Sequence, residues 1–77
     1  MMDELDVVVL VRPLAEHGLV TGALGTVVLV YDAGVAFEVE FMTPEGETLA
    51  VVTLDLADIR RATAADIGRW RAIEAAK

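Results

Sequence analysis

The sequence predicts a small, mainly β domain that ends in an α-helix. The chain has 77 residues, enough for one domain, and 56% of them are apolar, with many Val and Leu. Short β-branched runs alternate with Gly, Pro and Asp turns, a pattern typical of strands. From Thr63 onward the sequence changes to helix-forming residues. We therefore expect a β-barrel over residues 1–62 and a helix over residues 63–77 of the same single domain.

The first strand is expected over residues 6–12, and Pro13 ends it because proline has no N–H to donate to a sheet. The centre of this run is continuously apolar, which indicates a strand that is covered on both faces. The loop that follows, residues 14–22, has no regular period. We expect its Leu14 and Leu19 to turn inward and tie the loop to the core.

Residues 25–54 are expected to form a meander of three strands, at 25–31, 36–42 and 47–54. The middle strand alternates most clearly, and three of its apolar side chains should face the core: Phe37, Val39 and Phe41. Its two carboxylates should face water: Glu38 and Glu40. Gly34 supports a tight first turn, and Thr43–Gly46 has the Pro and Gly positions of a type I turn.

A turn at 55–58 and a brief strand at 59–62 complete the β region. The order of strand, long loop, meander, single turn and short closing strand is that of a five-stranded SH3-like barrel. Closing such a sheet would remove its exposed edges, which suits an apolar chain. A partly open OB-like barrel is the alternative.

The last segment begins with Thr63 and Asp66, whose spacing resembles a helix capping box. The helix is expected from Ala64 to Ala76 and carries a narrow apolar stripe: Ile67, Trp70 and Ile73. A helix of this length is not stable alone in water. Its stripe must pack on the barrel, on a second copy of the chain as a homo-oligomer, or on a partner.

Charge is distributed unevenly along the chain. Residues 1–58 carry eleven acids and one base, a net charge of −10, whereas residues 59–77 have a net charge of +3. Attraction between the two segments would help to dock the helix. An acidic body repels phosphate, so we expect no nucleic-acid partner, but it attracts a basic protein. Solubility alone is the competing explanation of the acidic composition.

We expect no catalytic, cofactor or metal site. The chain has no cysteine or serine, and its single histidine, His17, is next to Glu16, so the two do not normally converge on one substrate atom. We expect His17 to help fix its loop. The carboxylates lack the spacing of a calcium loop. An acidic N-terminus and the lack of a long apolar run predict a cytoplasmic protein without a membrane span.

The candidate partner-binding residues are four carboxylates around the third strand and one aromatic side chain on the helix: Glu38, Glu40, Glu45, Glu47 and Trp70. The carboxylates would form an acidic patch for a basic protein surface. Trp70 has arginines nearby, as aromatic anchors at interfaces often do. The competing interpretations are a solvated outer strand face for the glutamates and, for Trp70, a cover over an open end of the barrel.

The spacing Gly22-x-x-Gly25-Thr26-Val27-Val28 resembles the glycine signature of KOW-type and other SH3-like barrels. Residues 5–62 resemble a family of short bacterial proteins of unknown function, similar in layout to the nitrile hydratase β-subunit barrel and to accessory proteins of that enzyme. The segments that carry this resemblance are Asp6–Leu10, Leu14–Leu19, Gly22–Val28, Phe37–Phe41 and Leu49–Thr53. The helix at 63–77 departs from the pattern.

Members of that family that are encoded beside toxin-like or nuclease-like genes imply an antitoxin or immunity role. The resemblance therefore implies a non-enzymatic interaction module that binds and restrains a cognate protein, basic and encoded by a neighbouring gene. Two alternatives rest on layout alone: a scaffolding factor for a metalloenzyme such as nitrile hydratase, and a KOW-like RNA-binding barrel.

Overall fold

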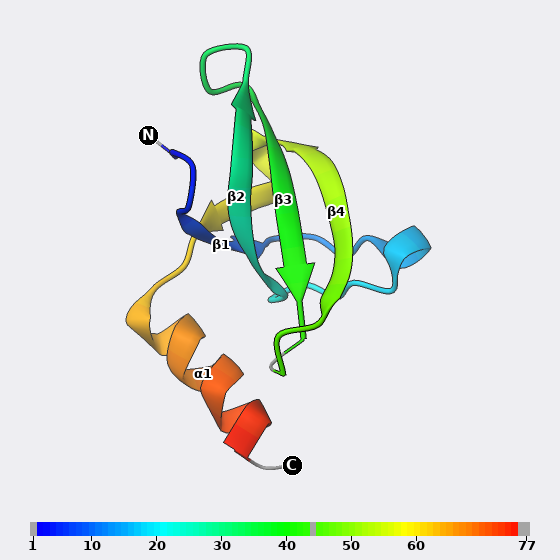
Figure 1. Cartoon of the computed structure of the whole chain (residues 1–77), viewed down its shortest axis with the longest axis vertical. Coiled ribbons are helices and arrows are strands. Elements are labelled where there is room, and N and C mark those ends of the chain that lie inside the picture. The colour runs from blue at the N-terminus through cyan, green and yellow to red at the C-terminus, as the bar shows by residue number, and fades with distance from the viewer. Residues whose placement is uncertain (1, 44, 76–77) are drawn as a thin grey trace.

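The computed structural model describes residues 2–43 and 45–75, and of residues 71 and 73–75 it describes the backbone only. Five strands, two 3-10 turns and one helix follow each other along the chain (Figure 1). The strands are β1 (Val7–Leu10), β2 (Leu24–Tyr31), β3 (Ala36–Met42), β4 (Thr48–Asp55) and β5 (Ile59–Arg61). The 3-10 turns are η1 (Ala15–His17) and η2 (Leu56–Asp58), and the helix is α1 (Ala64–Ala75).

The five strands form one antiparallel sheet in the order β4-β3-β2-β1-β5. This confirms the mainly β fold with a C-terminal helix, and the connections follow the order expected for an SH3-like barrel. We expected the sheet to close into a barrel, but it is open, because β4 and β5 stand at its two ends. β5 has only three residues, all of them paired with β1, and η2 links it to β4.

The observed bounds of β3 equal the predicted ones, whereas the other elements differ by one or a few residues. The largest difference is in β1, which ends at Leu10 rather than at Arg12. Beyond Leu10 the backbone N–H of Val11 donates to the carbonyl of Asp58, 2.9 Å away, instead of continuing the ladder with β2. The predicted end of the helix at Ala76 lies outside the described residues.

The main core lies on one face of the sheet. Its buried members are Val8, Leu10, Leu14, Leu19, Val27, Phe37, Val39, Phe41, Leu54 and Ile59. The inward orientation predicted for the apolar residues of β3 is therefore confirmed. The β1–β2 loop is tied to this core as predicted, because Leu14 and Leu19 are buried and exchange backbone hydrogen bonds of 2.9 and 3.1 Å.

A second apolar layer covers the opposite face of β1. Val9 is only 2% exposed, yet it lies between Val8 and Leu10, which both face the main core, so its own side chain faces outward. The helix α1 lies on that outer face, where Ile67 and Trp70 meet β1 and β2. The prediction that β1 is covered on both faces is thus confirmed. The described part of the helix stripe packs on the sheet of its own chain, and the side chain of Ile73 lies outside the described residues.

Candidate protein-interaction surface

The outer face of the three meander strands carries two of the predicted site residues. We call this surface the meander face; its residues are Leu29, Tyr31, Glu38, Glu40, Thr48, Leu49, Val51 and Thr53. The strand register sets its pattern: Glu38 stands between Leu29 and Thr53, and Glu40 stands between Thr26 and Val51. Each carboxylate is therefore flanked by side chains from both neighbouring strands.

Hydroxyl groups from the neighbouring strands hold both carboxylates. The Tyr31 hydroxyl donates to Oε2 of Glu38 at 2.7 Å, and the Thr53 hydroxyl donates to Oε1 of the same residue at 2.9 Å. The Thr48 hydroxyl donates to Oε2 of Glu40 at 2.7 Å. The hydrogen bond from Tyr31 to Glu38 raises the pKa of Tyr31, because the carboxylate stabilises the protonated hydroxyl that donates to it. The glutamates face outward as predicted, but they are half-buried and fixed in position.

Apolar side chains surround these carboxylates, and their place at this surface was not predicted from the sequence. Leu29, Leu49 and Val51 are 42%, 56% and 52% exposed. Leu49 is the extra residue at a register irregularity, since Ala50 pairs with Phe41 whereas Thr48 pairs with Met42. The alternation of β4 could have identified both Leu49 and Val51 as outward residues, because they are two residues apart in the strand. A surface that mixes exposed apolar and oriented polar groups is typical of protein interfaces.

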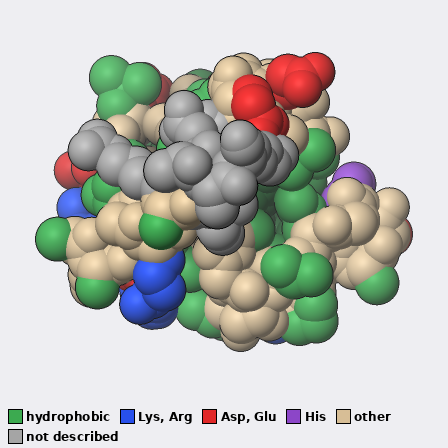
Figure 2. All heavy atoms as spheres, turned by 90° about the horizontal axis from the view of Figure 1, so that it is seen from below, with side chains coloured by type: hydrophobic (Ala, Val, Ile, Leu, Met, Phe, Trp, Pro, Cys, Tyr) green, Lys and Arg blue, Asp and Glu red, His purple; other side chains and the backbone are tan. Residues whose placement is uncertain are grey.

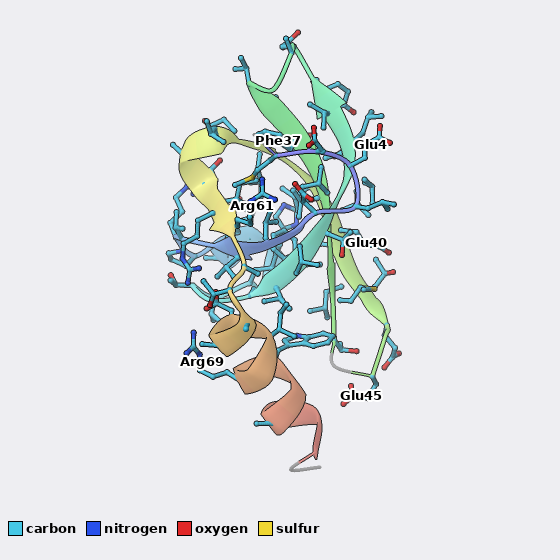
Figure 3. The ribbon with its side chains drawn as sticks, turned by 90° about the vertical axis from the view of Figure 1, so that its left-hand side faces the viewer. Glu4, Phe37, Glu40, Glu45, Arg61 and Arg69 are labelled. Atoms are coloured by element: carbon cyan, nitrogen blue, oxygen red, sulfur yellow. The ribbon has the colours of Figure 1, made fainter. Side chains whose placement is uncertain are left out.

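The other two predicted glutamates lie in the β3–β4 turn and not on the meander face. Thr43 fixes this turn: its N–H donates to the Glu47 carbonyl at 2.8 Å, and its hydroxyl accepts from the Glu47 N–H at 3.1 Å. Glu45 and Glu47 are both exposed. Glu40 and Glu45 lie on one side of the molecule in Figure 3, and Arg61 and Arg69 lie on the other. The predicted patch of four carboxylates is thus divided between a strand face and a turn.

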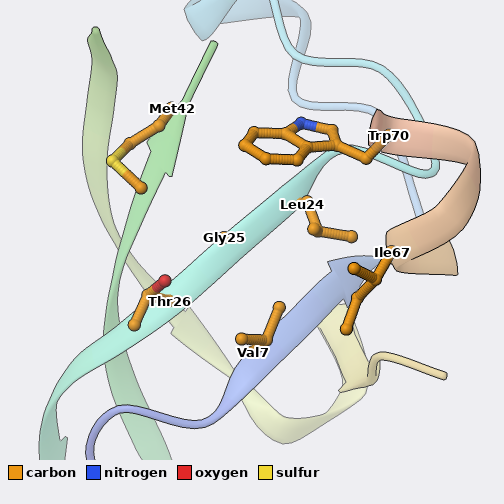
Figure 4. A pocket seen from close by; sticks show the side chains of 7 residues that line it. All are labelled: Val7, Leu24, Gly25, Thr26, Met42, Ile67 and Trp70. Atoms are coloured by element: carbon orange, nitrogen blue, oxygen red, sulfur yellow. The ribbon is translucent and has the colours of Figure 1, made fainter. Parts of the chain in front are cut away.

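Trp70, the fifth predicted residue, lines a cavity of about 240 Å³ between α1 and the sheet. Its indole ring lies over β2, with Met42 across the cavity from it (Figure 4). The cavity is lined by Val7, Leu24, Gly25, Thr26, Met42, Ile67 and Trp70. Thr26 is also the cross-strand neighbour of Glu40, so half-buried Trp70 borders the meander face along β2.

At the start of α1, the buried carboxylate of Asp66 forms ion pairs with two arginines. Asp66 is 6% exposed and accepts two hydrogen bonds from Arg60, at 2.8 and 3.1 Å, and one from Arg69 at 2.6 Å. It also accepts from the Thr63 N–H at 2.8 Å, while its own N–H donates to the Thr63 hydroxyl at 3.2 Å. This confirms the predicted capping box. The bonds from Arg60 and then from the Thr63 N–H hold the pKa of Asp66 far below its usual range.

Two further ion pairs join distant segments. Arg61 bonds Asp6 at 3.0 Å, which links the C-terminal segment to the acidic body as the charge distribution predicted. Arg12 pairs with Asp58 in η2, and this bond lowers the pKa of the nearly buried carboxyl. In the view from below, the largest group of basic side chains is at the lower left, apart from the acidic side chains at the upper right (Figure 2).

His17 is exposed at the end of η1, and its backbone N–H donates to Leu14 at 3.0 Å. Within residues 2–43 and 45–75, no group of three or more His, Asp or Glu side chains is placed to hold a metal ion. The helices of the described chain are all too short or too polar to cross a membrane.

A family model described as "Domain of unknown function (DUF4926)" matches residues 4–61. The chain belongs to this DUF4926 family. The match covers all five strands and ends before α1, which agrees with the expectation that residues 5–62 represent a family of unknown function. No curated protein matches the chain, and no solved structure does either.

Proposed function

We propose that this DUF4926 protein is a non-catalytic interaction module that binds a basic region of a partner protein through the meander face. By occupying that region it restrains the partner, as an antitoxin or immunity protein does. The observation that carries the proposal is the pair of carboxylates, Glu38 and Glu40, held by neighbouring hydroxyls within an exposed apolar surface.

The two kinds of group on the meander face have different roles in binding. Burial of Leu29, Leu49 and Val51 would supply most of the affinity, because burying apolar surface is favourable. Glu38 and Glu40 would select a cationic partner and set its orientation. Since their carboxylates are already held by hydroxyls, little side-chain entropy is lost when a Lys or Arg of the partner meets them.

The surrounding charges support a basic partner. The segment 1–58 has a net charge of −10, which attracts a cationic protein over distances of about a Debye length, ~8–10 Å. Glu45 and Glu47 extend this field beyond the end of β3. Trp70 adds a half-buried aromatic edge beside the face. RNA is the weaker alternative, because Arg60 and Arg69 already bond to Asp66.

The test is co-expression with the product of the neighbouring gene, followed by calorimetric titration of the two purified proteins. We expect the double variant Glu38→Gln/Glu40→Gln to bind at least about tenfold more weakly than the unchanged protein. The matched control is Glu16→Gln/Asp32→Asn, which removes the same charge from two exposed residues outside the meander face. This control should bind almost normally.

Equal losses of affinity in the two double variants would show that only net charge matters, and would contradict the proposal. Unchanged affinity in both, or the lack of any complex with the neighbouring gene product, would also contradict it. Circular dichroism of each variant checks that the fold is retained.

A further inference from the structure

We infer that the partner docks by adding an extended, basic segment to the free edge of β4, so that the sheet gains another strand. This inference rests on the proposed function and specifies how binding occurs. β4 stands at one end of the sheet, and the strand it pairs with is β3. An edge strand presents a row of N–H and C=O groups, which an extended peptide can pair with.

The two edges of the sheet differ in how well they are protected against pairing with a further strand. β5 is short, with three residues, and it carries Arg60 and Arg61, whose charges discourage further pairing. β4 is eight residues long and contains no Lys, Arg or Pro. Its bulge lies near its start at Leu49, and the register from Ala50 to Asp55 is uninterrupted. Over most of its length, β4 therefore lacks the features that usually keep an edge strand from pairing with another chain.

The side chains of β4 also favour strand addition. Val51 is 52% exposed, and Thr53 and Asp55 are exposed on the same outer face. A new strand beside β4 would lie about 10 Å from β3, two strand spacings away. A Lys or Arg side chain on the outer face of that strand can extend over Val51 and Thr53 towards Glu40 and Glu38.

Charge decides between a basic partner and a second copy of this chain. A second copy of the chain has the same net charge of −7, with Glu47 just before β4 and Asp55 at its end, so two β4 edges that paired would bring like charges together. Like charges directly opposite each other destabilise a sheet. A basic segment meets the same acidic positions with opposite charge, so it is the occupant that the edge favours.

The experiment uses the full chain and a synthetic peptide of alternating Val and Lys that is as long as β4, eight residues. We expect the peptide to bind and to slow hydrogen exchange at alternate backbone amides of β4, measured by NMR. A copy N-methylated at every backbone nitrogen keeps the charge and the side chains but cannot donate to a ladder. It should bind at least about tenfold more weakly. A peptide of the same length with alternating Val and Glu should not bind.

Equal binding of the methylated and unmethylated peptides would overturn the inference, and so would slowed exchange that avoids β4. If the free chain sediments as a dimer with its β4 amides protected, a second copy of the chain and not a basic partner occupies the edge, and the inference is wrong. The proposed function is tested separately: if the neighbouring gene product binds in a manner that depends on Glu38 and Glu40 while β4 amides exchange as before, only the strand addition fails.

Discussion

Gly25 occupies a position at which even one methyl group has no room. A Cβ atom there would lie 2.7 Å from Cγ1 of Val39 and 3.0 Å from two ring carbons of Phe41. Both neighbours are fully buried, so neither can move into solvent. The φ angle of Gly25 is not in the left-handed region, and the effect of Gly25→Ala is therefore overpacking rather than backbone strain.

Overpacking of a well-filled core costs about 1–3 kcal/mol. A chain of 77 residues is expected to have a free energy of unfolding of about 4–12 kcal/mol. Gly25→Ala should therefore remove a large share of the stability and lower Tm by about 4–8 °C for each kcal/mol lost. Urea unfolding followed by circular dichroism, with the fluorescence of the single tryptophan as a second probe, measures the change.

Gly68→Ala is the matched control, because this exposed helix position has no atom within 4 Å of the added Cβ. It should raise stability by up to about 1 kcal/mol through helix propensity. Val39→Ala combined with Gly25→Ala removes the closest contact, so the pair should be less destabilising than the sum of the single changes, by about 0.5–3 kcal/mol. A Gly25→Ala protein as stable as the unchanged chain would refute this description of the core.

Two further predictions concern titration. Stability should fall in acid, because Asp58 and Asp66 both have pKa values in the folded protein that are below the usual range. Their contribution to stability is present above the pKa of the unfolded chain, about 3.9, and is lost as the pH falls through the pKa values of the folded protein. Urea midpoints at decreasing pH measure this loss, and an Asp66→Asn variant with an equally steep decline would argue against it. The single tyrosine, Tyr31, should titrate above its usual range, and Glu38→Gln should lower its pKa in a spectrophotometric titration. Identical curves for the two proteins would rule out the hydrogen bond as the cause.

Local patterns were enough to predict the strands and turns. The alternation of β3 gave its bounds because each residue of that strand faces either the core or the exterior. The Thr63–Asp66 spacing gave the start of α1, since a capping box forms between neighbours in sequence. Asp55 and Asp58 form a similar reciprocal cap on η2, although their spacing in the sequence predicted only a turn.

Contacts between distant segments could not be predicted in this way. The partners of Glu38 depend on the register of three strands, which the bulges shift, so the sequence indicated a solvated carboxylate and not one bonded to Tyr31 and Thr53. The pairing of Arg12 with Asp58 spans 46 residues. Opposite net charges of two segments predicted their attraction, but only the folded arrangement determines which arginine meets which carboxylate.

The cover that α1 lays over β1 has a consequence for other members of the DUF4926 family. The shared domain ends at residue 61, before this helix begins, while Val9, on the strand face where α1 lies, is almost inaccessible to water. A relative that stops after its last strand would leave the equivalent of Val9, with those of Val7 and Leu24, bare on its surface. Chain length and polarity at these three positions should therefore vary together across the family, with hydrophilic residues wherever the C-terminal extension is missing.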